Sequence, residues 1–174
     1  MIARQISPQE LPNYMAELTE TLIKTVEGDG AVGFVLPIDQ ATAEGFWLNN
    51  IQPALLSGER IMHAAFIDDH FAGTGQLIVG MPNNQPHRAE ISKLMVHPKF
   101  RRRGVARALM SALEQEAVSL GRSLITLDTR TGDNAEPLYK SLGYKTAGII
   151  PNYAKNAVGN DFHATTYMYK QVGP

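Results

Sequence analysis

The segment Arg101-Arg102-Arg103-Gly104-Val105-Ala106 lies between an expected strand, at 88–96, and an expected amphipathic helix, at 103–120. A helix N-terminus carries unpaired backbone N–H groups and the positive end of the helix dipole, and both favour phosphate. Gly104 and Ala106 keep bulky side chains away from these groups, and the arginines add positive charge. The segment lacks the glycine-rich patterns of nucleotide triphosphatases and dinucleotide-binding folds. We therefore expect a pyrophosphate site, with a solvated basic patch as the alternative.

On either side of this segment, the hydrophobic pattern predicts a mixed α/β fold. Gly121 is expected to end the helix at 103–120. The apolar face of that helix consists of Val105, Leu109, Leu113, Ala117 and Leu120. Strands are expected near 2–6, 61–67, 72–79, 124–127, 144–149 and 163–169, and further helices at about 11–26, 39–52 and 133–143.

The composition is that of a folded protein with little net charge. The chain has 174 residues, 44% of them hydrophobic, and a formal net charge of -1. This length fits a single domain spanning 1–174. The small net charge provides no general attraction to nucleic acid or to an anionic membrane, so we expect neither as a partner.

The chain contains no cysteine, which excludes disulfides, thiolate metal sites and a cysteine nucleophile. The histidines are scattered without ligand spacing, so no metal site is expected. The first residues lack the apolar core of a signal peptide, and no apolar run approaches the roughly 20 residues that span a membrane. We therefore expect a cytoplasmic protein. Its oligomeric state stays open, and a homodimer is compatible with the sequence.

Two motifs resemble the GNAT superfamily of N-acetyltransferases. Arg101-x-x-Gly104-x-Ala106 matches its acetyl-CoA signature, [RQ]-x-x-G-x-[GA], and Leu94-Met95-Val96-His97-Pro98 is similar to the strand that precedes it. Leu138-Tyr139-Lys140-Ser141-Leu142-Gly143-Tyr144 resembles the second signature, L-Y-x-x-x-G-[FY]. The clear match covers about 88–145. It implies acetyl-CoA as cosubstrate and the GNAT fold, a central mixed, mostly antiparallel sheet flanked by about four helices.

Shorter segments resemble the tabtoxin-resistance acetyltransferases, a GNAT subfamily that inactivates a bacterial toxin by acetylating it. These are Gly33-Phe34, Arg88-Ala89-Glu90, Lys93-Leu94-Met95-Val96 and Leu127-Asp128-Thr129. The resemblance implies direct transfer of acetyl to the primary amine of a small molecule, such as an amino-acid-like toxin, an antibiotic or a metabolite. It does not fix the substrate. A protein N-terminal or lysine acetyltransferase and a non-catalytic acetyl-CoA sensor remain alternatives.

The resemblance also implies which residues contact the cofactor. Many family members have Asn seven residues before the motif tyrosine, where this chain has Gly132, so Asp133 or Asn134 is expected to substitute. The expected cofactor residues are Leu94, Met95, Val96, Arg101, Arg102, Arg103, Gly104, Val105, Ala106, Arg107, Asn134 and Tyr139.

Three residues are candidates for catalysis. Tyr139 aligns with the tyrosine that many GNAT enzymes place beside the coenzyme A sulfur, where a phenol can protonate the departing thiolate. Its alternative is a core aromatic residue. Glu90 lies eleven residues before Arg101, near the position of the glutamate base of related histone acetyltransferases. An ion pair of Glu90 with Arg88 or Lys93 is equally compatible.

Asp128 follows the expected strand at 124–127 and could orient the amine or accept its proton through water, as the subfamily resemblance also suggests. Its alternative is a strand-end residue bonded to turn amides. Phe34, Trp47 and Tyr153 are expected in the walls of the acceptor site in this fold, with core packing as the alternative. An acceptor carboxylate would need a positive partner, and the candidates are Lys93, Arg130 and Lys155.

Overall fold

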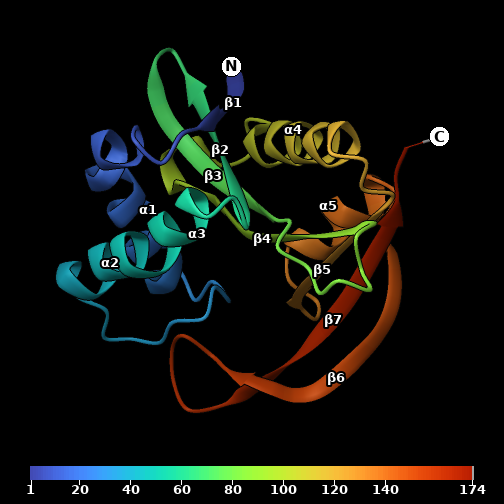
Figure 1. Cartoon of the computed structure of the whole chain (residues 1–174). Helices are drawn as coiled ribbons and strands as arrows, with labels where there is room; N and C mark the ends of the chain where they lie inside the picture. Colours follow the sequence, from blue (N-terminus) through green and yellow to red (C-terminus); the bar gives the residue numbers. More distant parts are fainter. Residues whose placement is uncertain (174) are drawn as a thin grey trace.

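Seven strands form one sheet in the order β1-β2-β3-β4-β5-β7-β6 in the computed structural model, which describes residues 1–173 (Figure 1). Every neighbouring pair is antiparallel except β4 and β5, which are parallel. The expected mixed, mostly antiparallel sheet is therefore confirmed. The strands are β1 (Ile2–Ile6), β2 (Arg60–Ile67), β3 (His70–Ile78), β4 (Arg88–Val96), β5 (Leu124–Arg130), β6 (Lys145–Lys155) and β7 (Phe162–Gln171).

The helices form an N-terminal group, α1 to α3, and two later helices, α4 and α5. None of the helices within residues 1–173 combines the length and apolar character that crossing a membrane requires. The helices are α1 (Met15–Glu27), α2 (Gln40–Phe46), α3 (Gln52–Leu56), α4 (Val105–Ser119) and α5 (Ala135–Ser141), with short helical turns η1 (Leu11–Tyr14), η2 (Trp47–Ile51) and η3 (Pro98–Phe100).

Two prolines shape the N-terminal helices. Pro12 lies in the 3-10 turn η1, and the regular helix α1 begins only after it, at Met15. The expected helix end before Pro53 is wrong, because the chain continues through the π-helical turn η2 into α3. Pro53 occupies the first turn of α3, where a backbone N–H has no intrahelical partner and its loss costs little.

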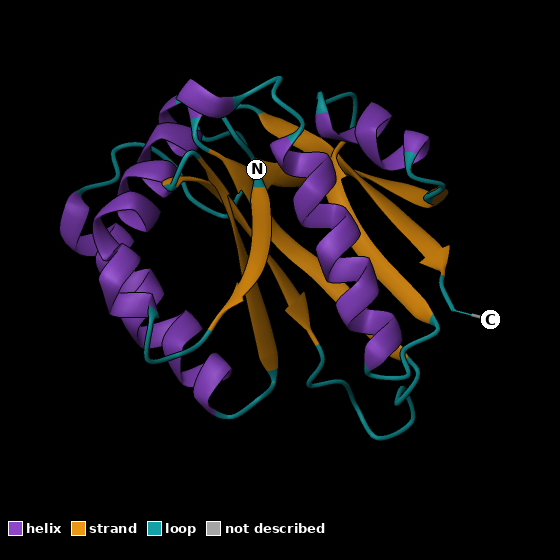
Figure 2. Ribbon diagram, turned by 90° about the horizontal axis from the view of Figure 1, so that it is seen from above, coloured by secondary structure: helices purple, strands orange, loops and turns teal. Residues whose placement is uncertain are grey.

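Helix α4 and the N-terminal helices cover the sheet from different sides, and Figure 2 shows α4 lying along the strands, apart from the N-terminal helices. Val105, Leu109, Leu113 and Ala117 of α4 are buried, as their spacing predicts. Leu120 is the exception, at 45% exposed, because it lies beyond the last helical turn. A second core beneath α1–α3 contains Leu18, Leu22 and Trp47.

The sheet opens between β4 and β5. The two strands pair only from Arg88↔Leu124 to Glu90↔Thr126, although β4 continues to Val96 and β5 to Arg130. Beyond that point the backbone of β4 that faces β5 has no strand partner in the described structure. The parallel pair therefore forms a V, and the space between its arms is available for a ligand.

Strand β4 also carries an irregularity at this point. Its register against β3 shifts between Thr74 and Gln76, and Lys93 adopts a positive φ of 52°. A positive φ is uncommon for a residue with a side chain, and it changes the direction in which the side chain leaves the strand. Lys93 consequently lies in the wall of the V-shaped opening.

Candidate active site

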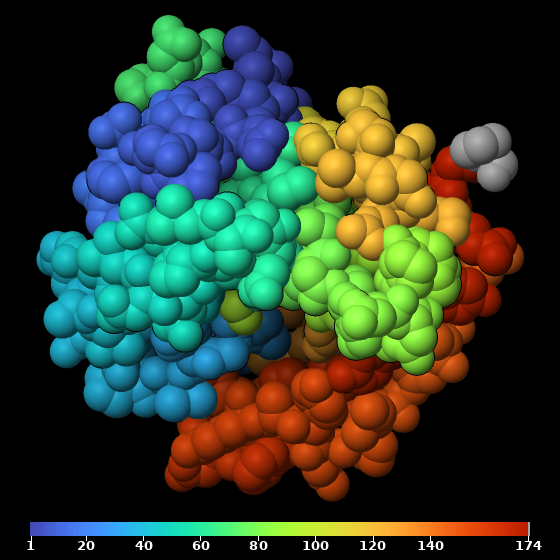
Figure 3. Space-filling model, in the orientation of Figure 1, coloured from blue at the N-terminus to red at the C-terminus, as the bar shows by residue number. Residues whose placement is uncertain are grey.

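A cavity of about 1030 Å³ occupies the opening between β4 and β5. Figure 3 shows the surface hollowed where the blue-to-cyan N-terminal part of the chain, the light-green segment and the orange-red C-terminal hairpin meet. This volume is at the upper end of the range for small-molecule and cofactor sites. The lining comes from the α1–α2 loop (28–35), β4 (91–96), the segments 100–102 and 104–107, the segments 128–130 and 133–135, α5 (138–139), and β6 and β7 (153–155, 163, 165).

The expected phosphate loop forms one end of this cavity. Arg102 has a φ of 59° and Gly104, the N-cap of α4, has a φ of 82°. Glycine adopts this left-handed conformation without the steric cost that a side chain brings. No side chain caps the N-terminus of α4. Its first-turn N–H groups therefore remain free to bind an anion such as a pyrophosphate.

The arginines of the loop have separate positions. Arg101, Arg102 and Arg107 line the cavity, together with Val105 and Ala106. Arg103 does not line it, and its guanidinium lies 5.7 Å from the ring centroid of Phe100. A direct contact of Arg103 with the cofactor is thus not supported by this geometry, which places only its neighbours beside the phosphate site.

The remaining expected cofactor residues line the middle of the cavity, between the phosphate loop and the opposite end, which we call the acceptor end. Leu94, Met95 and Val96 line the cavity from β4, and Asn134 and Tyr139 line it from the opposite arm. The free edge of β4 offers backbone groups that an amide-containing chain can bind in the manner of an added strand. The free helix N-terminus, the strand edge and the apolar walls fit the pyrophosphate and pantetheine arm of acetyl-CoA.

Tyr139 projects from α5 into the cavity. The residue is 6% exposed, and its hydroxyl makes no hydrogen bond to the described residues. Burial, followed by the charges of Asp128 and Asp133, raises the pKa of Tyr139 well above the ordinary value for tyrosine. The phenol is therefore protonated at physiological pH and is free to donate to a ligand.

The two candidate bases differ in position. Asp128 lines the cavity, and its carboxylate has no ion pair or hydrogen bond with the described residues. Glu90 does not line the cavity and accepts a 3.1 Å hydrogen bond from Nη1 of Arg88. The same Nη1 donates to Thr126 Oγ1 at 2.8 Å. Of the two carboxylates, Asp128 is the one that can reach a ligand in the cavity.

Of the three aromatic residues expected in the walls of the acceptor site, two line the cavity and one lies in the core. Phe34 and Tyr153 line the cavity, and Tyr153 Oη lies 2.8 Å from Tyr167 Oη. Trp47 is fully buried in the core, so direct contact with an acceptor is wrong for this residue. Trp47 acts only through packing, because its ring contacts Phe46 and Phe46 contacts Phe34.

Lys93 is a half-buried cation without a carboxylate partner within salt-bridge distance. Its Nζ donates to the carbonyl oxygen of Val32 at 2.8 Å, and no described carboxylate lies within 4.0 Å of it. Burial, and next the charge of Arg60, lower the pKa of Lys93 below its ordinary value, and the charge of Asp128 opposes them only in part. Arg130 is already bonded to Asp29, and Lys155 is exposed. Lys93 is therefore the best-placed candidate to bind an acceptor carboxylate.

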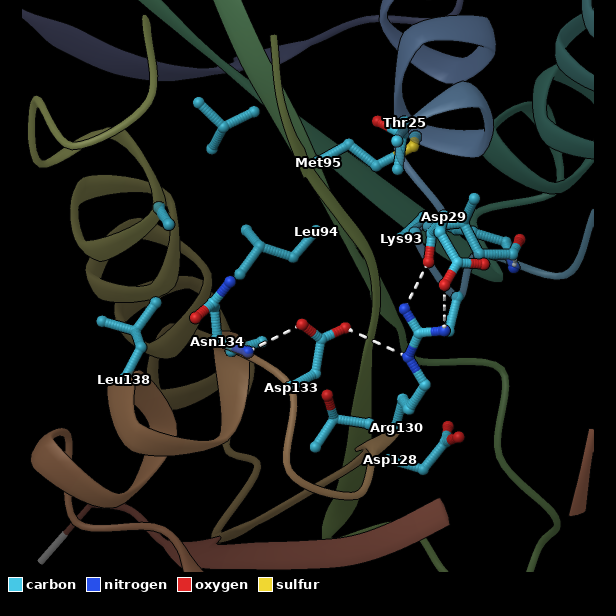
Figure 4. Close-up of a pocket in the computed structure, with 18 of the residues that line it drawn as sticks. Thr25, Asp29, Lys93, Leu94, Met95, Asp128, Arg130, Asp133, Asn134 and Leu138 are labelled. Atoms are coloured by element: carbon cyan, nitrogen blue, oxygen red, sulfur yellow. Dashed lines mark hydrogen bonds and ion pairs between the residues drawn. The ribbon is translucent and has the colours of Figure 1, made fainter. Parts of the chain in front are cut away.

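Several lining residues escape prediction from the sequence. Asp29, Ser92, His163 and Thr165 reach the cavity from a helix end, a strand and the C-terminal hairpin. None belongs to a motif, and each depends on contacts between distant parts of the chain. Figure 4 shows how Asp29 meets the Asp128–Asp133 segment across the cavity.

The sequence and fold match known acetyltransferases. The model of the acetyltransferase (GNAT) family matches residues 16–144. An uncharacterized N-acetyltransferase in the hisH-hisA intergenic region of Azospirillum brasilense is 31% identical over 123 residues, which are 70% of this chain and 71% of that protein.

Two solved structures show the same fold. A ribosomal-protein-alanine N-acetyltransferase from Brucella melitensis has a TM-score of 0.77 at 19% identity and covers 99% of this chain and 100% of its own. An aminoglycoside 6'-N-acetyltransferase complexed with coenzyme A has a TM-score of 0.74 at 20% identity, with coverage of 100% and 98%. The family match spans both arms of the cavity and both signatures. The chain therefore belongs to the GNAT family and is an acetyl-CoA-dependent N-acetyltransferase.

Proposed function

We propose that the enzyme acetylates the primary amine of a small, amino-acid-like molecule, such as a toxin, an antibiotic or a metabolite. One observation carries this proposal: the cavity contains an anion, Asp128, and a cation, Lys93, and neither makes an ion pair within 4.0 Å with a described residue. Asp128 is exposed toward the cavity, whereas Lys93 is half-buried, and a half-buried charge is stabilised when a ligand supplies the opposite charge. A molecule with both an amine and a carboxylate complements this pair.

In the proposed reaction, side chains of the enzyme accept one proton, from the acceptor amine, and donate one proton, to the departing thiolate. Acetyl-CoA supplies the activated acetyl group as a thioester. Asp128 takes the proton of the acceptor amine, directly or through one water, because a protonated amine has no lone pair for attack. Tyr139 holds the proton that the departing thiolate needs, since its hydroxyl lines the cavity and has no protein partner.

The two groups assist one another electrostatically. The negative charge of Asp128 is the second cause, after burial, of the raised pKa of Tyr139. When Asp128 accepts a proton, that charge is neutralised, and the pKa of Tyr139 falls. The phenol thus becomes a better acid at the stage at which a thiolate leaves.

The acceptor end of the cavity favours a small molecule. The backbone N–H of Leu36, in the α1–α2 loop, donates to the carbonyl oxygen of Ala157 at 2.9 Å, and Ala157 is 4% exposed. In Figure 3 the blue loop abuts the orange-red hairpin. A peptide chain needs a groove that is open at both sides, whereas a compact acceptor fits behind this contact.

A panel of amines should show kcat/KM for free amino-acid-like acceptors at least about tenfold higher than for lysine-containing or N-terminal peptides. Release of coenzyme A thiol, followed with each amine and with no amine, provides the measurement. A preference for peptides by that factor would instead support a protein acetyltransferase, the activity for which the Brucella melitensis enzyme is named.

Within the panel, each amino acid is paired with its amide, and Lys93→Met is compared with wild type. The preference for the carboxylate requires protonated Lys93, whose pKa is lowered by burial and by Arg60. It should therefore be present at neutral pH, disappear as the pH rises through that lowered pKa, and be absent in Lys93→Met. An equal preference in both proteins would remove Lys93 from acceptor binding.

Asp128→Asn should lower kcat/KM by about tenfold to a hundredfold, at the low end of general-base effects. The loss should be largest near neutral pH and smaller at alkaline pH, where the free amine no longer needs a base. Glu90→Gln is the matched control, because Glu90 lies on the neighbouring strand outside the cavity. If Glu90→Gln lost more activity than Asp128→Asn, the roles assigned to the two carboxylates would be reversed.

A further inference from the structure

The side chain of Arg130, at the end of β5, joins the two walls of the acceptor end. Its Nη1 donates to Asp29 Oδ2 at 2.9 Å and to Asn156 Oδ1 at 3.2 Å, and its Nη2 donates to the carbonyl oxygen of Asp29. Its Nε lies 3.5 Å from Asp133 Oδ2. Figure 4 shows this guanidinium between Asp29 and Asp133. The side chain is only 17% exposed.

Asp29 is the second half of this connection. It follows the C-terminal end of α1 with a φ of 59°, an uncommon conformation that aspartate tolerates better than most residues. Its Oδ1 accepts a 3.1 Å hydrogen bond from the backbone N–H of Val158, in the β6–β7 loop. One carboxylate therefore binds both Arg130 and the tip of the C-terminal hairpin.

The connected segments come from opposite sides of the cavity. Asp29 belongs to the α1–α2 loop, Asn156 and Val158 to the β6–β7 loop, and Asp133 to the loop that leads to the cofactor side. The planar guanidinium can bond several oxygens at once with fixed geometry, which a lysine cannot do. Arg130 also lies two residues after Asp128 on the same strand, so both side chains leave the same face of the sheet.

We propose that Arg130 is a positioning residue that determines acceptor size: by holding the two loops together it closes the acceptor end and keeps the acceptor amine against Asp128. This inference rests on the proposed small-molecule function and names the residue responsible for that selectivity. A purely structural ion pair would contribute to folding but would not change which amines react.

Arg130→Met removes every donor and keeps an apolar side chain of similar length. We expect KM for the preferred small acceptor to rise at least about tenfold, with kcat changed by less than about threefold. The ratio of kcat/KM for tripeptide amines to that for small amines should rise at least about tenfold. Titration calorimetry should find the Kd for acetyl-CoA within about twofold of wild type, because the phosphate loop lies at the other end of the cavity.

Lys170→Met is the matched control. It breaks the Lys170–Glu114 ion pair, whose Nζ–Oε2 distance is 2.6 Å and whose side chains are 25% and 17% exposed. Neither residue lines the cavity. This variant loses a comparably buried ion pair, so thermal melting should fall to a similar degree, while the peptide-to-small-amine ratio should stay at the wild-type value.

Asp29→Asn provides a second variant that keeps the size of the side chain and weakens the bond to Arg130. Asp29→Asn should raise the ratio of kcat/KM for tripeptide amines to that for small amines by a smaller factor. If Arg130→Met is unfolded at the assay temperature, the conclusion rests on Asp29→Asn. An unchanged ratio and KM in folded variants would overturn the role of Arg130 while leaving the proposed function intact. If wild type acetylates no small amine, the proposed function fails and this inference fails with it.

Discussion

Replacing Tyr139 by phenylalanine is expected to lower kcat by about a hundredfold to ten-thousandfold, the usual contribution of general acid–base catalysis. The substitution removes one hydroxyl that lies in the cavity without a protein partner. The ring remains in its core position against Tyr144, at a centroid distance of 6.0 Å. Because the hydroxyl acts as the thiolate forms, the Kd for acetyl-CoA should change much less than kcat.

Tyr144→Phe is the control for this experiment. Tyr144 is also buried, at 3% exposed, but it does not line the cavity. Its substitution should leave kcat within about threefold of wild type, within the range of a neutral change. Single-turnover measurements are needed to ensure that chemistry limits the rate. A wild-type rate for Tyr139→Phe under those conditions would exclude Tyr139 as the acid.

Gly104→Val should abolish acetyl-CoA binding, with the Kd raised at least about a hundredfold, which corresponds to about 2.7 kcal/mol. Two physical effects combine. The φ of 82° at Gly104 is unfavourable for a β-branched residue, and the new side chain would stand beside the free N–H groups of α4. Without a ligand the space is open, since a Cβ at Gly104 would meet only the Met1 side chain at 3.7 Å. Folding should therefore survive the substitution.

Gly121→Val is the control for backbone strain, because it introduces the same kind of strain away from the binding site. Gly121 lies just beyond the other end of α4 with a φ of 70°, and nothing described lies within 4 Å of a Cβ placed there. It should lose stability through the same conformational penalty but bind acetyl-CoA with wild-type affinity by calorimetry. Normal affinity of Gly104→Val would mean that the pyrophosphate binds elsewhere.

Local sequence patterns were sufficient for the elements around the phosphate loop. The spacing of Val105, Leu109 and Leu113 predicted the buried face of α4, because helical periodicity depends on neighbouring residues alone. Local reasoning failed at Pro53, where a π-helical turn lets the chain continue into α3.

The roles of individual side chains depended on tertiary structure to different degrees. Glu90 and Asp128 were equivalent as sequence candidates, and only the divergence of β4 from β5 leaves Asp128 in the cavity while Glu90 bonds to Arg88. Trp47 and Phe34 were likewise equivalent as sequence candidates for the acceptor site. Packing buries Trp47 in the core and leaves Phe34 in the wall of the cavity. Such choices depend on which strands pair and where pairing stops, which no local pattern encodes.

The sequence by itself determined the family and predicted the phosphate loop and Tyr139 as the candidate acid, because each depends on a short segment whose chemistry is local. Only the tertiary structure placed Lys93 in the wall of the cavity and Arg130 between Asp29 and Asp133. Asp29 and Arg130 are 101 positions apart, and the hydrogen bond that joins them exists only because α1, β5 and the β6–β7 hairpin converge at one end of the cavity. Closing so long a loop is repaid by the packing of the whole sheet and its helices, so the contact cannot be inferred from either segment alone.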